Sequence, residues 1–147
     1  MNKNLVLAAG VAVIAVVSFM FLRVNSSSVP VPQNTNQKSM TINLVEYSDS
    51  SQSGTATLSD ENGKLKVILD ITGASSQVPQ PAHIHTGNCP RIGPVVYGLT
   101  DVSGNHSETT LDTNLEELMA SNTTLSINVH KSYDDFKTYT SCGDLKK

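Results

Sequence analysis

Histidine is the residue type in this chain that could do chemistry, and three of the four histidines fall in a pattern that suits a metal ion. His83 and His85 flank Ile84 in a run of strand-forming residues, and the two-residue period of a strand places both imidazoles on one face. His130 ends a second such run, residues 125–130, and meets that face if the two strands are neighbours. Three neutral imidazoles suit copper in either oxidation state. The spacing predicts a metal site, although a histidine pair on a sheet can also be an ordinary hydrogen-bonded surface feature.

The elements that must position these histidines are short strands. Residues 64–71 alternate between apolar and polar side chains, and the preceding Asn62-Gly63 predicts a tight turn, so residues 54–71 should form a hairpin. Turns are expected at 87–93 and 101–105, and a short helix at 114–120. Seven or eight short strands in one domain are typical of an antiparallel β-sandwich or barrel. The expected strands are residues 41–47, 54–58, 64–71, 82–86, 94–99, 106–111, 124–130 and 138–142.

The N-terminal end of the chain is apolar and predicts export. No charged residue lies between Leu5 and Leu22, and a helix of this length spans roughly 27 Å, close to the thickness of the hydrocarbon core of a bilayer. We predict one transmembrane helix, a signal anchor, over residues 1–23, a flexible linker over 24–38 and a single domain over 39–147.

A cleaved signal peptide is the competing interpretation of this segment, because its position and composition also fit one. In the first case the protein is a single-pass membrane protein whose domain faces the periplasm or the cell surface. In the second it is secreted. Both interpretations place the domain on the extracytoplasmic side.

The charge of the expected domain limits the kinds of molecule that it can bind. All 13 acidic residues but only seven of the 10 basic residues follow residue 38, which gives residues 39–147 a formal charge of −6. Binding to nucleic acid is excluded, because each phosphate contact needs a cation. The chain also has no phosphate-binding glycine loop and no Gly-x-Ser-x-Gly turn, so nucleotide binding and hydrolase activity have no support. The acidic balance suits attraction of metal cations.

The two cysteines, Cys89 and Cys142, both lie in the expected domain. An exported chain with an even number of cysteines favours one disulfide bond, which would close a loop of about 54 residues. Two free thiols or two metal ligands are the alternatives, and the separation of the two cysteines lacks the short Cys-x-x-Cys spacing of zinc sites.

Several segments of the sequence resemble a known protein family. Residues 81–87 (Pro-Ala-His-Ile-His-Thr-Gly), 93–99 (Gly-Pro-Val-Val-Tyr-Gly-Leu) and 126–132 (Ser-Ile-Asn-Val-His-Lys-Ser) resemble the CHRD domain. With residues 140–145 (Thr-Ser-Cys-Gly-Asp-Leu), they also resemble the copper/zinc superoxide dismutase fold. The resemblance covers about residues 41–145 and implies an all-β, antiparallel Greek-key sandwich or barrel. It places His83, His85 and His130 on copper-ligand positions, and Cys89 and Cys142 on a disulfide.

Departures from the dismutases bear on function. Only residues 90–93 separate Cys89 from the next expected strand, where the dismutases carry a long loop with the bridging histidine and the zinc ligands, so we expect no zinc. Tyr139 stands where the dismutases place an arginine that guides superoxide. His106 follows a turn whose counterpart in that family is far from the metal, and we expect it to be a surface residue.

Three functions fit these observations. The first is a membrane-anchored domain that binds one copper ion for sequestration, delivery or redox protection. The second is a copper-only enzyme similar to superoxide dismutase, and the third is a structural or adhesion domain without metal. The acidic charge favours the first over the second, because it attracts cations better than it steers an anion. No protein partner is indicated.

Overall fold

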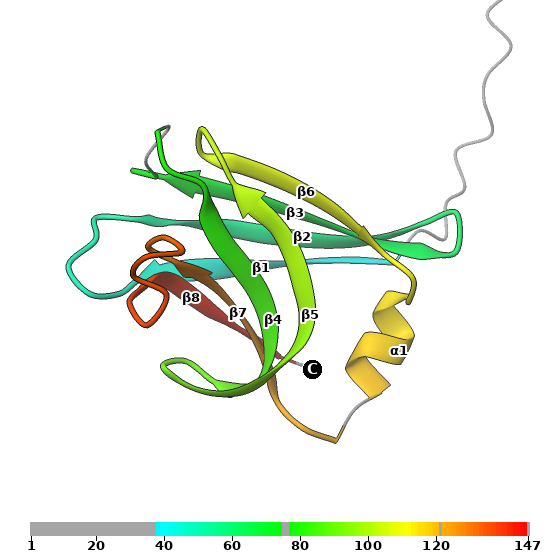
Figure 1. The fold of residues 1–147 in the computed structure, drawn as a ribbon. Coiled ribbons are helices and arrows are strands. Elements are labelled where there is room, and N and C mark those ends of the chain that lie inside the picture. Colours follow the sequence, from blue (N-terminus) through cyan, green and yellow to red (C-terminus); the bar gives the residue numbers. More distant parts are fainter. Residues whose placement is uncertain (1–37, 75–76, 121, 147) are drawn as a thin grey trace, which may run out of the picture. The chain divides into compact units, whose positions relative to one another are not determined.

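The computed structural model describes residues 38–74, 77–120 and 122–146. Eight strands and one short helix make up this part of the chain (Figure 1). The sequence-based expectation of an all-β domain with seven or eight strands is confirmed. The elements are β1 (Ser39–Glu46), β2 (Ser53–Glu61), β3 (Lys64–Thr72), β4 (Gln80–Asn88), β5 (Arg91–Val102), β6 (His106–Leu111), α1 (Leu115–Ala120), β7 (Leu125–His130) and β8 (Tyr139–Leu145).

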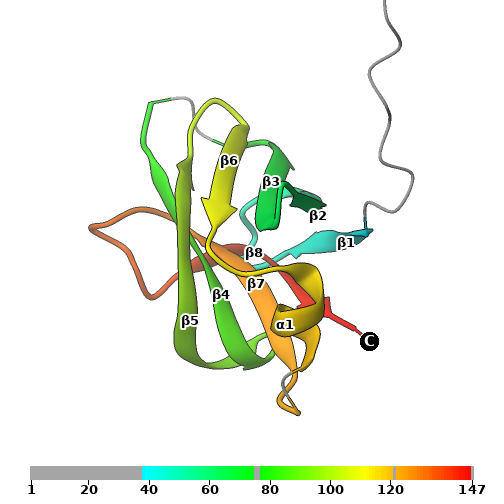
Figure 2. The same cartoon turned by 90° about the vertical axis from the view of Figure 1, so that its right-hand side faces the viewer.

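The strands form one antiparallel sheet that curls into a nearly closed barrel. Their order is β5-β4-β7-β8-β1-β2-β3-β6, so the chain crosses over three times, after β3, β5 and β6. One half of the barrel holds β1, β2, β3 and β6, and the other holds β5, β4, β7 and β8. The halves are joined where Val45 and Glu46 of β1 pair with β8. Figure 2 shows β5 and β6, the two ends of the order, side by side.

The hairpin of β2 and β3 follows from its sequence. Asn62 and Gly63 both have positive φ angles, 52° and 78°, as the tight turn between twisted strands requires. In β3, Leu65, Val67 and Leu69 are all fully buried, while the residues between them face outward. The alternation in the sequence therefore sets which face of this hairpin packs into the barrel.

The second hairpin, β4–β5, differs from the expectation. A turn was expected over residues 87–93, but β4 continues to Asn88 and β5 begins at Arg91, so the connection is tight. The pairing shifts register twice near His85, and Gly87 has a φ of 92°. These irregularities let both strands continue through a glycine-rich segment that looks like a loop in the sequence.

The interior of the barrel is apolar and lies on one face of the strands that carry the histidines. Ala82 and Ile84 of β4 and Ile127 and Val129 of β7 are fully buried in this core. His83 and His85, at the alternate positions, therefore stand on the outer face of the sheet. Packing of the apolar residues into the core thus places the candidate site on the outer face of the sheet.

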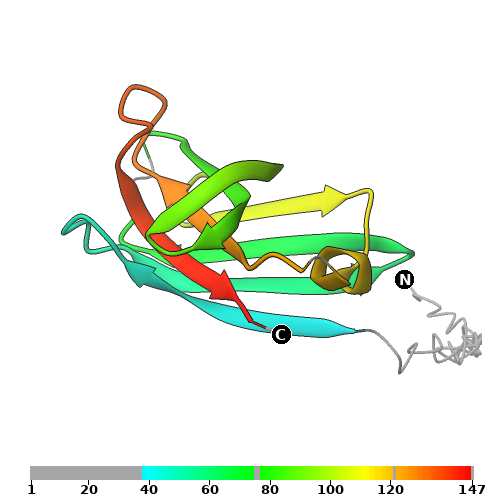
Figure 3. The ribbon, with the colours of Figure 1, turned by 90° about the horizontal axis from the view of Figure 1, so that it is seen from below.

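Helix α1 and the β7–β8 loop, residues 131–138, lie at opposite ends of the barrel (Figure 3). The backbone N–H of Glu117 donates to Asn114 Oδ1 at 2.9 Å, an N-cap, and Leu115 and Leu118 are buried. In the part of the chain that the structure describes, no helix has the length and apolar character needed to cross a membrane. The transmembrane helix expected over residues 1–23 lies outside the described residues, as does the expected linker except for Lys38.

Candidate metal centre

The structure brings together the three histidines that the sequence singled out. His83 and His85 come from β4, and His130 comes from the end of the neighbouring strand β7. Each offers one ring nitrogen, and these three atoms lie within 4.8 Å of one another. His83 Nδ1 and His130 Nε2 lie 3.1 Å apart, at hydrogen-bond distance. This cluster of ring nitrogens, called the histidine triad below, is a site that could hold a metal ion.

Backbone carbonyls fix the protonation of two of these rings. His85 Nδ1 donates to the carbonyl oxygen of Gly93 at 2.8 Å, and His130 Nδ1 donates to that of Phe136 at 2.5 Å. A neutral imidazole that carries its proton on Nδ1 has a free lone pair on Nε2. Both Nε2 atoms therefore carry an unprotonated lone pair, in the way that carbonyl groups orient metal-binding histidines. That of His85 has no partner among the described residues, whereas that of His130 lies 3.2 Å from Asn128 Nδ2 and 3.1 Å from His83 Nδ1.

Unpartnered polar atoms beside the histidines favour a metal ion at the triad. His85 Nε2 is buried and has no hydrogen-bond partner among the described residues. Asn128 Oδ1 and Ser126 Oγ, also buried without a partner, come from alternate positions of β7 on the same outer face. Each buried polar atom left unsatisfied costs about 1–3 kcal/mol. A cation that accepts the lone pair of His85 Nε2 would remove one such cost.

An aromatic cover from the β7–β8 loop closes one side of the triad. The ring of Phe136 stacks on that of His130, with centroids 3.9 Å apart and planes inclined by 16°. Tyr139 meets the same imidazole edge-on at 5.2 Å. His130 is consequently 2% exposed, whereas His83 is only partly buried. A metal ion would approach the triad from the side of His83.

Burial keeps two of the imidazoles neutral. It lowers the pKa of His130 to about 4, and the hydrogen bond to the carbonyl of Phe136 opposes this only in part. Burial also lowers the pKa of His83, with a further contribution from His85, while Asp101 acts in the opposite direction. Metal binding needs neutral imidazole, so protons do not compete with a metal at these two side chains near pH 7.

The stability of the metal-free protein should fall as the pH decreases from about 6.5 towards 4. In this window the unfolded chain protonates His130 and the folded protein does not, so the free energy of unfolding declines, by up to about 3 kcal/mol. Urea titrations of the metal-free protein at pH 7.5 and 4.5 measure this difference. The variant His130→Gln should lose much of the pH dependence, while His106→Gln keeps it. If the free energy of unfolding depends equally on pH in both variants, His130 is not the source of this dependence.

Glycine at position 93 allows the strand carbonyl to reach His85. A Cβ atom there would lie 2.4 Å from Thr86 Oγ1 and 3.2 Å from the Thr86 carbonyl oxygen. Gly93→Ala should therefore shift this carbonyl and weaken metal binding about tenfold, as losses of such supporting contacts do. Gly98→Ala is the matched control, because a Cβ there meets nothing within 4 Å. A metal titration of both variants checks the prediction, and equal affinities would argue against it.

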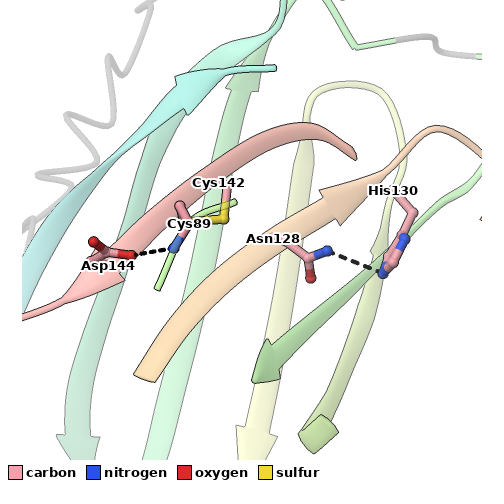
Figure 4. The surroundings of a disulfide bond; sticks show 5 residues. All are labelled: Cys89, Asn128, His130, Cys142 and Asp144. Carbon is pink, nitrogen blue, oxygen red and sulfur yellow. Dashed lines mark hydrogen bonds between the residues drawn. A yellow bond between two sulfur atoms is a disulfide. The ribbon is translucent and has the colours of Figure 1, made fainter. Parts of the chain in front are cut away.

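The disulfide is confirmed, and the alternatives of free thiols or cysteine metal ligands are excluded. Cys89 and Cys142 are bonded to each other (Figure 4). The bond ties the β4–β5 connection to β8, and the backbone N–H of Cys89 also donates to Asp144 Oδ1 at 2.8 Å. Cys142 pairs with Asn128 across β7 and β8, so the bond lies beside the strand that carries His130.

His106 stands apart from the triad, as expected. It is exposed at the start of β6, where its Nδ1 lies 2.8 Å from Asp70 Oδ1. Among the described residues, the group of possible ligands around the triad contains no fourth histidine and no cysteine or carboxylate.

Sequence reasoning missed three parts of the site: the amide of Asn128, the ring of Phe136 and the carbonyl of Gly93. Asn128 could have been found, because it precedes His130 by two residues and so shares its face of the strand. Phe136 lies in a loop of eight residues, and no periodicity indicates where its ring points. A backbone carbonyl leaves no mark in the sequence.

Comparison with known proteins gave one match. The model of the CHRD domain family matches residues 26–134, which include the whole histidine triad and Cys89. No curated protein and no solved structure matches the chain.

Proposed function

The chain belongs to the CHRD domain family, and from its histidine triad we propose that it binds one copper ion through His83 Nδ1, His85 Nε2 and His130 Nε2. The observation that carries this proposal is the buried Nε2 of His85, which is held as a ligand by the carbonyl of Gly93 and has no partner among the described residues. A copper ion at this position would accept the lone pairs of the three imidazoles. It would supply a redox-active centre that the side chains alone lack.

The chemistry of the donors supports copper over other metals. All three are imidazole nitrogens, which suit copper, zinc, nickel and iron and are poor ligands for magnesium or calcium. Both cysteines are used in the disulfide and are not thiolate ligands. For a given set of nitrogen ligands, affinity among the divalent first-row metals is highest for copper. Copper is therefore the metal that this set would retain in competition.

Charge favours a binding module over a dismutase-like enzyme. Besides the neighbouring imidazole, the charge that shifts the pKa of His83 is the carboxylate of Asp101. This carboxylate accepts a hydrogen bond from the hydroxyl of Tyr133, at 3.1 Å. A carboxylate near the open side of the triad attracts metal cations and repels superoxide. Sequestration, delivery or redox protection is the role that we propose.

We also propose that the domain works outside the cytoplasm. The apolar residues 1–23 would anchor it in the cell membrane, and residues 24–38 would serve as the tether. The disulfide agrees with an oxidising compartment, where such bonds persist. The copper site would then meet its metal at the extracytoplasmic side.

A copper titration of the full-length protein tests the proposal. We expect one Cu(II) or Cu(I) ion per chain, bound more tightly than micromolar, and no such binding by the double variant His83→Ala/His130→Ala. His106→Ala is the control, because it removes a histidine outside the triad and should leave the affinity unchanged. Absence of binding by the wild-type protein, or equal binding by the double variant, would refute the metal site and leave the structural role.

A further inference from the structure

Asn128 is a buried polar residue next to the triad, with no role in the proposed set of ligands. It lies directly opposite His83 in the pairing of β4 and β7, and it precedes His130 by two residues on the same strand. Its side chain therefore stands on the outer face with the three imidazoles. Asn128 is fully buried, at 0% exposure. A polar amide is costly at such a position unless its hydrogen bonds are satisfied.

Only one of the two polar atoms of the amide has a hydrogen-bond partner. Its nitrogen, Nδ2, lies 3.2 Å from His130 Nε2, and Figure 4 shows it pointing toward that ring. Because His130 Nδ1 carries the proton donated to Phe136, Nε2 is the acceptor of this bond. The other end, Oδ1, is buried and has no hydrogen-bond partner in the described part of the chain. The amide thus donates to the lone pair that a metal needs, and its own oxygen is left unpaired.

A half-turn of the amide would turn Oδ1 toward the triad, where a metal ion could accept its lone pair, while Nδ2 would take the buried position in which Oδ1 has no partner. Rotation about the last side-chain bond exchanges Oδ1 and Nδ2, which are nearly equal in size and shape. It would withdraw the N–H from His130 Nε2 and place Oδ1 about 3.2 Å from that nitrogen. His83 Nδ1 lies at 3.1 Å from the same atom. The amide oxygen would therefore lie about as close to His130 Nε2 as His83 Nδ1 does.

We propose that Asn128 is a fourth ligand of the site and determines its preference between the oxidation states of copper. This inference rests on the proposed function. An amide oxygen is a harder donor than imidazole, and oxygen donors suit hard cations, whereas soft ligands select Cu(I). Coordination by the oxygen of Asn128 therefore favours Cu(II). Without this oxygen, the three imidazoles form a site that suits Cu(I). In the empty site the same amide serves as the hydrogen-bond donor that holds His130 in place.

Separate Cu(II) and Cu(I) competition titrations of the full-length protein test this assignment. In Asn128→Leu, which is similar in size and lacks the oxygen, the Cu(II) dissociation constant should rise about tenfold or more, and that for Cu(I) should change less than threefold. In Asn128→Asp, which keeps the shape and supplies a carboxylate, Cu(II) binding should tighten relative to the wild type. Circular dichroism of each variant verifies that it is folded.

The outcomes separate this inference from the function on which it rests. If the wild type binds copper and Asn128→Leu binds both oxidation states as tightly or more tightly, Asn128 is only a donor that competes with the metal, and the inference is wrong while the copper site stands. Should Asn128→Leu fail to fold, an unchanged Cu(II) affinity in Asn128→Asp would overturn the inference in the same way. A wild-type protein that binds no copper would overturn both.

Discussion

Replacing His85 with leucine should reduce copper affinity by roughly 100-fold or more and leave the metal-free protein almost as stable as the wild type. The loss of affinity follows because one of the three ligands is removed. The small effect on stability follows because the substitution removes a buried nitrogen without a partner and fills the space with an apolar side chain of similar size. It also removes the hydrogen bond to Gly93, so we expect a net change within about 1 kcal/mol.

This separation of function from stability distinguishes a binding site from a structural histidine. Urea denaturation of metal-free wild type and His85→Leu measures the stability, and a copper titration measures the affinity. Copper at 100 times its dissociation constant should stabilise the wild type by about 2.7 kcal/mol and the variant hardly at all. If the free energy of unfolding of the metal-free variant falls by several kcal/mol, His85 supports the fold. That result would contradict its assignment as a residue kept for metal binding.

Removing the disulfide should cause the largest loss of stability. The bond between Cys89 and Cys142 spans a sequence separation of 53, and closing a loop of that length stabilises the folded state by about 4 kcal/mol in the chain-entropy model. Cys89→Ala/Cys142→Ala should lower the free energy of unfolding by about this amount. Reduced wild-type protein is the control for the substitutions themselves, because Cys142 is fully buried.

The copper site should survive this change when the protein stays folded, since neither cysteine belongs to the triad. We expect the dissociation constant of the folded double variant to remain within tenfold of that of the wild type. A complete loss of binding would show that the β4–β5 connection, which the bond ties to β8, is needed to hold the histidines in place.

The fold could be predicted from the sequence wherever a single physical rule determines the local structure. Alternation in Lys64–Thr72 determines which face is buried, and Asn62-Gly63 determines the turn before it, so the hairpin was predictable. The same two-residue period placed His83 and His85 together. Bringing His130 to them required β7 to pair with β4, a contact between distant segments that strand propensity does not determine.

The remaining parts of the site depend on tertiary contacts. The turn expected over residues 87–93 proved shorter because register shifts let β4 and β5 continue past His85. That continuation brings the carbonyl of Gly93 to within 2.8 Å of His85 Nδ1. The stacking of Phe136 on His130 depends on how an irregular loop folds back. Residue types therefore predicted the ligands, but not the groups that orient and cover them.

X-ray absorption spectroscopy of the full-length protein loaded with one equivalent of copper tests directly whether the three histidines bind the metal. We expect three imidazole nitrogens bound to copper in both oxidation states, no sulfur ligand, and loss of this signature in His83→Ala/His130→Ala. Copper that binds with fewer imidazoles, or with the same spectrum in wild type and double variant, would contradict this expectation.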